Sequence, residues 1–266
     1  MTIRPLDIER LKKDFQAAKP FPHLAIDGFL EEAFAAEIAA AYPSFEEADA
    51  IGLQFNAVNE NRKVQITEFE KFPDPVQRLS DLLSSESLRR DLAEITGIED
   101  LLWDPSHSGG GMHVTGPRGN LDVHIDFNQH EHTGLHRRLN LLVYLNPDWK
   151  RDWGGAVEIW DENVKECHGA FAPVFNRAVM FATSAISWHG VEAVKCPPGR
   201  TRNSFAVYYY TENVPPTFKG AHTTIFRARP DEYVKKYLLM PAQKAKEVLN
   251  EGRHKVRRAK EKLTGR

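Results

Sequence analysis

The chain has 266 residues, 41% of them hydrophobic, which is enough to form the core of one large domain. Its 35 Lys and Arg nearly balance its 37 Asp and Glu, so the overall charge gives no indication of a nucleic-acid partner. The two cysteines, Cys167 and Cys196, are too few for a disulfide scaffold or a thiolate zinc cluster. Two reduced thiols are expected, with one disulfide between them as the alternative.

The opening residues lack the apolar run of a signal peptide, and no stretch approaches the roughly 18–20 apolar residues of a membrane span. We therefore expect a cytoplasmic protein with no membrane partner. A small molecule or a peptidyl side chain is its expected substrate.

The first hundred residues have mostly helical patterns. An amphipathic helix is predicted over Ile8–Ala18, because the prolines that follow it cannot continue a helix. A short alternating run predicts a strand over His23–Asp27, and helical spacing returns over Leu30–Tyr42. A polar stretch without a predicted element then leads to a further helix over Pro75–Ile95.

From about Gly109 to Thr211 the helical period disappears. Short runs alternate apolar and polar residues and are separated by Gly, Pro, Asn and Asp, which is typical of a sandwich or barrel. Strands are predicted over Leu139–Leu145, Ala156–Trp160, Ala178–Thr183 and Ser204–Tyr210.

These patterns predict an α+β fold in one structural domain. Residues 1–105 are expected to be a helical support region packed on the core, and residues 106–215 to be the catalytic β core. Residues 216–266 would form a C-terminal extension ending in a basic helix, with nine Lys and Arg against three Glu from Lys244 to Arg266. That helix has no aromatic residues to stack on bases, so a solvated face or a homodimer contact is expected there.

A candidate metal site begins with His124 and Asp126. On a strand, residues two apart face the same side, so both side chains point into one cavity. His189, at the start of a later apolar run, is the preferred third ligand, although His113 or His132 would also serve on chemistry alone. Two histidines and one carboxylate leave three positions open, which is the ligand set of non-haem Fe(II) oxygenases.

A candidate carboxylate site follows on the last predicted strand. Arg202 and Ser204 share one face of that strand, and an arginine fork beside a hydroxyl is a good receptor for a carboxylate. Tyr144 could donate a phenolic hydrogen bond to the same group. Arg200 has the same parity as Arg202 and is the rival anchor.

Together these residues resemble the 2-oxoglutarate/Fe(II) dioxygenase superfamily and, within it, the prolyl 4-hydroxylase-like branch. The resemblance covers roughly residues 20 to 212. It is densest in Val143–Trp149, Trp153–Ile159 and Phe175–Phe181, and continues through His189 to the Arg202 strand.

The resemblance implies a double-stranded β-helix core, the jelly-roll or cupin-like fold. It implies that His124, Asp126 and His189 bind Fe(II), while Arg202 and Tyr144 bind 2-oxoglutarate, with Ser204 beside them. The expected reaction uses O2, with ascorbate as a supporting reductant. It hydroxylates an unactivated C–H bond and releases succinate and CO2. Proline is one candidate substrate residue.

Two other functional classes stay open from the sequence. A jelly-roll protein that binds metal or sugar without redox chemistry would have no need for Arg202 and Ser204 at that place. A non-catalytic interaction protein would use the three metal candidates as ordinary polar residues. Substrate selection is predicted to lie in two polar loops, 106–120 and 128–138, where Arg118 and Arg137 could meet an anionic group.

Overall fold

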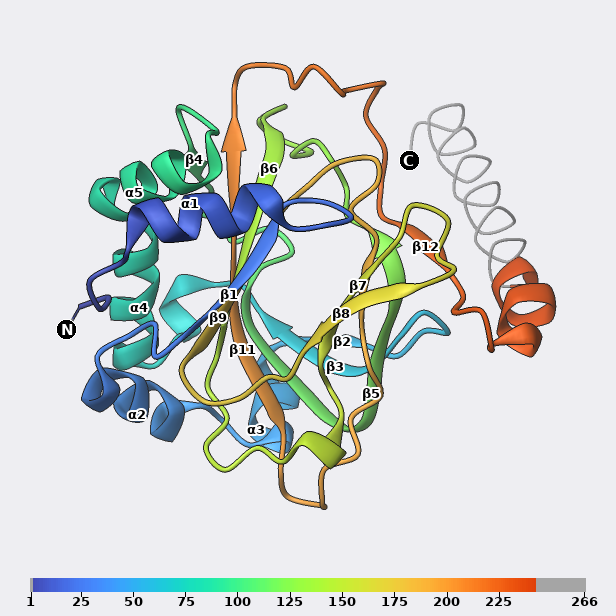
Figure 1. The fold of residues 1–266 in the computed structure, drawn as a ribbon. Helices are drawn as coiled ribbons and strands as arrows, with labels where there is room; N and C mark the ends of the chain where they lie inside the picture. The colour runs from blue at the N-terminus through green and yellow to red at the C-terminus, as the bar shows by residue number, and fades with distance from the viewer. Residues whose placement is uncertain (1, 243–266) are drawn as a thin grey trace, which may run out of the picture.

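The computed structural model describes residues 2–242 (Figure 1). Its helices are α1 (Ile8–Ala17), α2 (Glu32–Ala41), α3 (Phe45–Ile51), α4 (Asp74–Ser84) and α5 (Glu86–Thr96). Its strands are β1 (His23–Asp27), β2 (Leu53–Phe55), β3 (Glu60–Ile66), β4 (Leu102–Trp103), β5 (Gly111–Ile125), β6 (His136–Tyr144), β7 (Val157–Trp160), β8 (Cys167–Phe171), β9 (Arg177–Ala182), β10 (His189–Val191), β11 (Arg202–Thr211) and β12 (Ile225–Arg227). The predicted basic helix lies outside the described residues.

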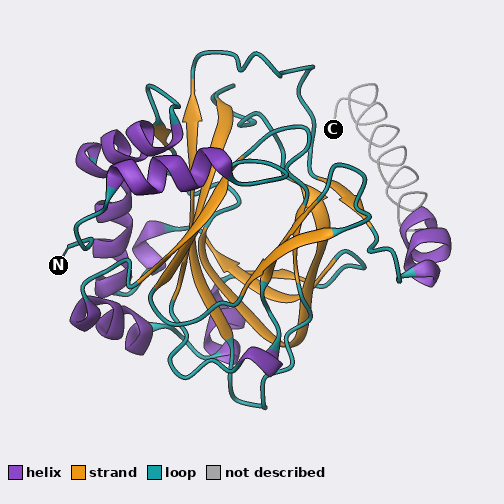
Figure 2. Ribbon diagram, in the orientation of Figure 1, coloured by secondary structure: helices purple, strands orange, loops and turns teal. Residues whose placement is uncertain are grey.

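The strands form one antiparallel sheet that curls into a nearly closed barrel (Figure 2). The strand order is β1-β9-β6-β11-β5-β10-β7-β8, with β3 and β12 also paired to β5. The long strand β5 belongs to both halves of the barrel: Thr115 pairs with Arg202 on β11, and His124 pairs with His189 on β10. This is the predicted double-stranded β-helix, and the predicted α+β class is confirmed.

Alternation along the strands decides which side chains reach the interior. On β6, Leu139, Leu141 and Val143 face outward and belong to the same apolar core as the buried faces of the helices. Asn140 and Tyr144, at the alternate positions, face the other way. The helices α1, α2, α4 and α5 therefore cover one face of the barrel and leave its interior to polar groups (Figure 1).

The helix predicted over Pro75–Ile95 is two helices. Ser85 ends α4 in an extended conformation, and its hydroxyl accepts a hydrogen bond from the backbone amide of Leu88 at 3.3 Å. This N-cap starts α5 in a new direction. Hydrophobic periodicity continues across the break because both helices bury apolar residues in the same core.

Three segments that were expected to be loops or had no predicted element contain strands. Residues 106–120 were expected to be a loop, but β5 begins at Gly111, and 128–138 overlaps β6, which begins at His136. The polar stretch after α2 contains the β2–β3 hairpin. Val64 and Ile66 on β3 point away from the barrel interior and are buried in the apolar core. Among residues 2–242, no helix is long and apolar enough to cross a membrane.

Candidate active site

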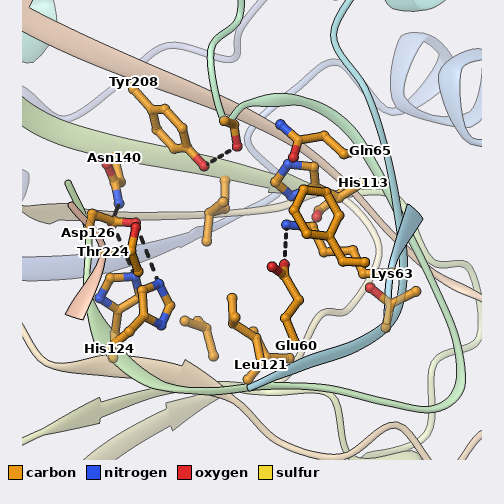
Figure 3. A pocket seen from close by; sticks show the side chains of 18 of the residues that line it. Glu60, Lys63, Gln65, His113, Leu121, His124, Asp126, Asn140, Tyr208 and Thr224 are labelled. Carbon is orange, nitrogen blue, oxygen red and sulfur yellow. Dashed lines mark hydrogen bonds and ion pairs between the residues drawn. The ribbon is translucent and has the colours of Figure 1, made fainter. Parts of the chain in front are cut away.

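The barrel interior contains a cavity of about 210 Å³. At one end lie His124, Asp126 and His189, and the same cavity reaches Arg202 and His113 near the other end. Figure 3 shows His124 and Asp126 on one side and His113 on the opposite side. The candidate metal site and the candidate carboxylate site are therefore parts of one space.

The three predicted metal ligands come together in the structure. One potential ligand atom from each of His124, Asp126 and His189 lies within 4.8 Å of the others. Nε2 of His124 is 3.5 Å from Oδ1 of Asp126, and Nε2 of His189 is 3.4 Å from its Oδ2. The bulged pairing of β5 with β10 sets the two imidazoles side by side, with ring centroids 4.2 Å apart.

Both imidazoles are oriented by backbone carbonyls on their own strands. Nδ1 of His124 lies 2.8 Å from the carbonyl oxygen of Asp122, and Nδ1 of His189 lies 2.9 Å from that of Ser187. A carbonyl can only accept, so each Nδ1 carries the proton and each Nε2 keeps its lone pair for the centre of the site. This donor set fits a divalent transition metal.

Asp126 is held by two further side chains. Its Oδ2 accepts a hydrogen bond from Nδ2 of Asn140 at 2.7 Å and lies 3.0 Å from Nη2 of Arg137. Burial would raise the pKa of Asp126, but Arg137, His189 and His124 together outweigh it and hold the pKa well below its usual range. Burial, together with the neighbouring His124, lowers the pKa of His189 to about 3. The site therefore presents a carboxylate and a neutral imidazole at neutral pH, the forms that bind metal.

Arg137, which was predicted to lie in the substrate loop 128–138, is on a strand. It lies on β6 with 3% of its surface exposed, and its guanidinium stacks 3.4 Å from the ring centroid of Tyr208. Arg118 is exposed at the surface, and so is His132, one of the alternative ligands. Neither lines the described cavity at the metal end.

The carboxylate end is built around Arg202. Arg202 is buried, its Nε donates to the carbonyl oxygen of Gly155 at 2.6 Å, and its Nη2 donates to the hydroxyl of Tyr144 at 3.1 Å. The rival Arg200 is exposed and lies near Trp153 outside this cavity. The loop between β10 and β11 turns before Arg202, which explains why two residues of the same parity have different surroundings.

Two buried polar atoms beside Arg202 have no partner in the described chain. They are Oγ of Ser204 and Nε2 of His113. Tyr144, Ser204 and His113 are register partners across β6, β11 and β5, so they form one row on the inner face. Unpaired buried polar atoms are costly, and a bound carboxylate would satisfy both together with the arginine fork.

From the sequence, His113 was an alternative metal ligand, and nothing placed it beside Arg202. The pKa of His113 lies well below its usual value because of burial and the nearby cations Lys63 and Arg202. Its place beside Arg202 follows from the pairing of β5 with β11. That pairing could be anticipated only if residues 111–115 were recognised as a strand, and the run of glycines at 109–111 argued against it.

The cavity wall also includes residues that carried no signal in the sequence. Glu60 and Lys63 on β3 form an ion pair of 2.8 Å, with side chains 14% and 13% exposed. Thr224 and Phe226, from the segment around β12, close the metal end, where the Phe226 ring lies 5.5 Å from that of His124. These residues lie far from the metal ligands in sequence, so only the fold brings them there.

Comparisons with known proteins agree with this geometry. Residues 110–210 match the family model of the 2OG-Fe(II) oxygenase superfamily. Over 88 residues the chain is 31% identical to the prolyl 3-hydroxylase OGFOD1 of Mus musculus, a match that covers 31% of this chain and 16% of that protein. The chain therefore spans only a small part of the curated relative it matches.

Solved structures have the same fold. A prolyl hydroxylase from Trichoplax adhaerens, in complex with a hypoxia-inducible-factor peptide, gives a TM-score of 0.54 at 18% identity, covering 77% of this chain and 91% of that chain. A Pseudomonas putida prolyl-4-hydroxylase gives 0.55 at 14% identity, covering 77% and 100%.

The family match names the metal and the co-substrate of this domain as Fe(II) and 2-oxoglutarate, and the donor set and the unpaired atoms described above fit both groups. The resemblance predicted from the sequence is thereby confirmed. That resemblance rests on residues 110–210, the part of the chain that matches the 2OG-Fe(II) oxygenase superfamily model.

Proposed function

We propose that this protein is a 2-oxoglutarate- and Fe(II)-dependent dioxygenase that hydroxylates an unactivated C–H bond. The observation that carries the proposal is the single cavity that joins the histidine–aspartate cluster to the buried Arg202. A jelly-roll protein without redox chemistry would need the metal ligands but not a second, carboxylate-binding end of the same cavity.

In this proposal His124, Asp126 and His189 hold the metal. Arg202 binds the far carboxylate of 2-oxoglutarate, and Tyr144, Ser204 and His113 donate hydrogen bonds to it. When bound, iron and 2-oxoglutarate supply the activation of O2, with release of succinate and CO2. The chain contributes orientation, because its inward-facing rows fix both ends of the co-substrate, and a buried site that excludes water.

The substrate would enter past Glu60, Lys63 and Thr224. The two charged groups satisfy each other in the structure described, and a substrate with polar or charged groups could exchange contacts with them. A small molecule and a peptidyl side chain both fit this description, and proline is a candidate because the curated relative is a prolyl 3-hydroxylase.

The test is succinate formation from 2-oxoglutarate with added Fe(II), ascorbate and O2, measured across free amino acids, proline-containing peptides and small metabolites. The proposal expects iron-dependent succinate in the absence of substrate and a rise with the true substrate. Metal binding with no succinate under any condition would favour the non-redox alternative.

A further inference from the structure

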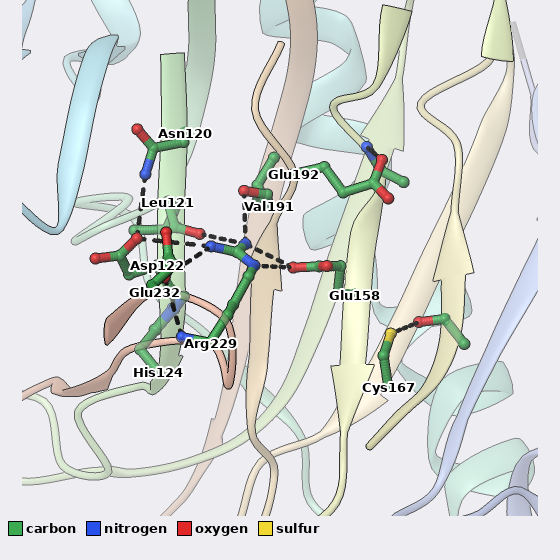
Figure 4. Close-up of polar contacts among 12 residues, drawn as sticks. Asn120, Leu121, Asp122, His124, Glu158, Cys167, Val191, Glu192, Arg229 and Glu232 are labelled. Atoms are coloured by element: carbon green, nitrogen blue, oxygen red, sulfur yellow. Dashed lines mark hydrogen bonds and ion pairs between the residues drawn. The ribbon is translucent and has the colours of Figure 1, made fainter. Parts of the chain in front are cut away.

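An ion-pair cluster lies on the outer face of the strands that carry the two histidines (Figure 4). At its centre is Arg229, just after β12. Its Nε and Nη2 donate to Oε2 of Glu158 on β7 at 2.9 and 2.6 Å. Lys235 donates to Oδ1 of Asp122 on β5 at 2.7 Å and to Glu232 at the same distance. The C-terminal segment is thus tied to β5 and β7.

Arg229 also contacts the backbone at an irregularity next to the metal site. On β10 the paired residues His189 and Val191 are two apart, whereas their partners His124 and Leu121 on β5 are three apart. Strand β5 therefore carries an extra residue, a β-bulge, directly before His124. Such a bulge interrupts the ladder and leaves backbone carbonyls in need of donors.

The guanidinium of Arg229 supplies those donors. Its Nη2 lies 3.1 Å from the carbonyl oxygen of Val191 and 3.4 Å from that of Leu121, which are register partners at the bulge. One planar side chain therefore joins β5, β10 and β7 at the level of the metal ligands. Lysine, with one compact ammonium, could not reach all three strands with the same geometry.

A second connection runs through the bulge residue Asp122. Its carbonyl oxygen accepts from Nδ1 of His124 and so orients that imidazole. Its side chain is fully buried, with Oδ1 2.7 Å from Nζ of Lys235 and 3.6 Å from Nη1 of Arg229. Fixing this side chain fixes the peptide that orients His124.

Burying charged side chains costs desolvation free energy, so a buried ion-pair cluster does not by itself show that these residues stabilise the fold. Glu158 and Arg229 have side chains only 10% and 14% exposed. Their placement against the bulge, beside both histidine strands, indicates a geometric role.

We propose that Arg229 is a positioning residue for the metal centre, which keeps β5 and β10 in the register that brings Nε2 of His124 and His189 together. This inference rests on the proposed function, because it assumes that these histidines bind metal. It adds a residue that touches neither metal nor co-substrate and lies about forty residues beyond the last ligand in sequence.

The experiment titrates Co(II) into the metal-free full chain and records the visible Co(II) spectrum, which reports coordination geometry. Arg229→Gln should bind Co(II) about 10–100-fold more weakly than the wild type, with an altered spectrum. The matched control is Lys236→Gln, which removes a positive charge from an exposed position in the same segment and should bind as the wild type does.

The outcomes are distinguishable. If the wild type binds no Co(II), the proposed function fails. If the wild type binds and folded Arg229→Gln binds with the same affinity and spectrum, this inference alone is overturned, even if the variant is less stable. Should Arg229→Gln not fold, Arg229→Lys, which retains the charge opposite Glu158, should still weaken binding, and wild-type affinity in that variant would overturn the inference.

Discussion

Asn140 donates from Nδ2 to Oδ2 of Asp126 at 2.7 Å, and the same oxygen lies 3.0 Å from Arg137. Because Oδ2 already has one hydrogen bond and one ion pair, we expect Oδ1, which lies 3.5 Å from Nε2 of His124, to be the oxygen that faces the metal. The carboxylate should therefore coordinate through one oxygen, which preserves the positions needed by 2-oxoglutarate and O2.

The first prediction concerns this contact. Asn140→Ala should weaken Fe(II) binding about tenfold or more, because hydrogen bonds to a ligand orient it and their loss typically costs 10–100-fold. The measurement is an anaerobic Fe(II) titration. Asn163→Ala, at an exposed turn, is the control. Equal affinities in the two variants would show that Asn140 does not orient the carboxylate.

The second prediction distinguishes His189 from His132 as the third metal ligand. His189→Ala should abolish Fe(II) binding and turnover, since it removes one of three ligands, while far-UV circular dichroism stays unchanged. His132→Ala, which alters an exposed turn residue, should leave both intact. Full activity in His189→Ala would mean that another residue completes the metal site.

The third prediction separates the two arginines. Arg202→Ala should lower the apparent affinity for 2-oxoglutarate roughly ten- to a hundredfold, because a charge-assisted hydrogen bond contributes about 1.5–3 kcal/mol. Arg200→Ala should have no effect, because that side chain is exposed and outside the cavity. Initial rates against 2-oxoglutarate concentration measure both, and the reverse result would move the anchor to Arg200.

Much of this arrangement could be predicted from local sequence. The strand parity of His124 with Asp126, and of Arg202 with Ser204, depends only on residues two apart, so it survives errors in strand boundaries. Helices α1 and α2, the helical stretch that divides into α4 and α5, and the strands β6, β7, β9 and β11 were also predicted, because each has a recognisable apolar period.

Contacts that depend on long-range pairing could not be predicted. The cation–carboxylate pair of Arg137 and Asp126 requires β5 and β6 to pair with the two edges of β11. The wall residue Lys63 requires the polar β2–β3 hairpin to pair with β5. The position of Arg229 on the bulge requires the C-terminal segment to return to the barrel. Sequence spacing has no signal for any of these contacts.

The fourth prediction replaces the expected substrate loops with the wall seen in the structure. Lys63→Met should reduce product formation from the true substrate while leaving substrate-independent 2-oxoglutarate turnover largely intact. Arg118→Ala, which changes an exposed residue of the originally predicted loop, should alter neither rate. Parallel loss of both activities in Lys63→Met, with loss of iron, would make Lys63 structural.

The fifth prediction concerns pH. Burial tends to raise the pKa of Asp104, but hydrogen bonds from Ser106 and Ser108 outweigh it and lower this pKa below 3.8. A folded-state pKa below the unfolded one contributes stability above the unfolded value, and that contribution is lost as pH falls through the folded value. Wild type should therefore lose more stability than Asp104→Asn as pH falls from about 5 to 3. Parallel urea-unfolding curves for the two proteins across this range would contradict the prediction.

The most direct test of the central claim is an anaerobic titration of the Fe(II)-loaded protein with 2-oxoglutarate, followed in the visible charge-transfer region and then by exposure to O2. The account predicts a new absorption band on binding, its loss with succinate release when O2 is admitted, and no band in Asp126→Ala. A wild-type protein that binds one Fe(II) but gives neither the band nor succinate at saturating 2-oxoglutarate would contradict it.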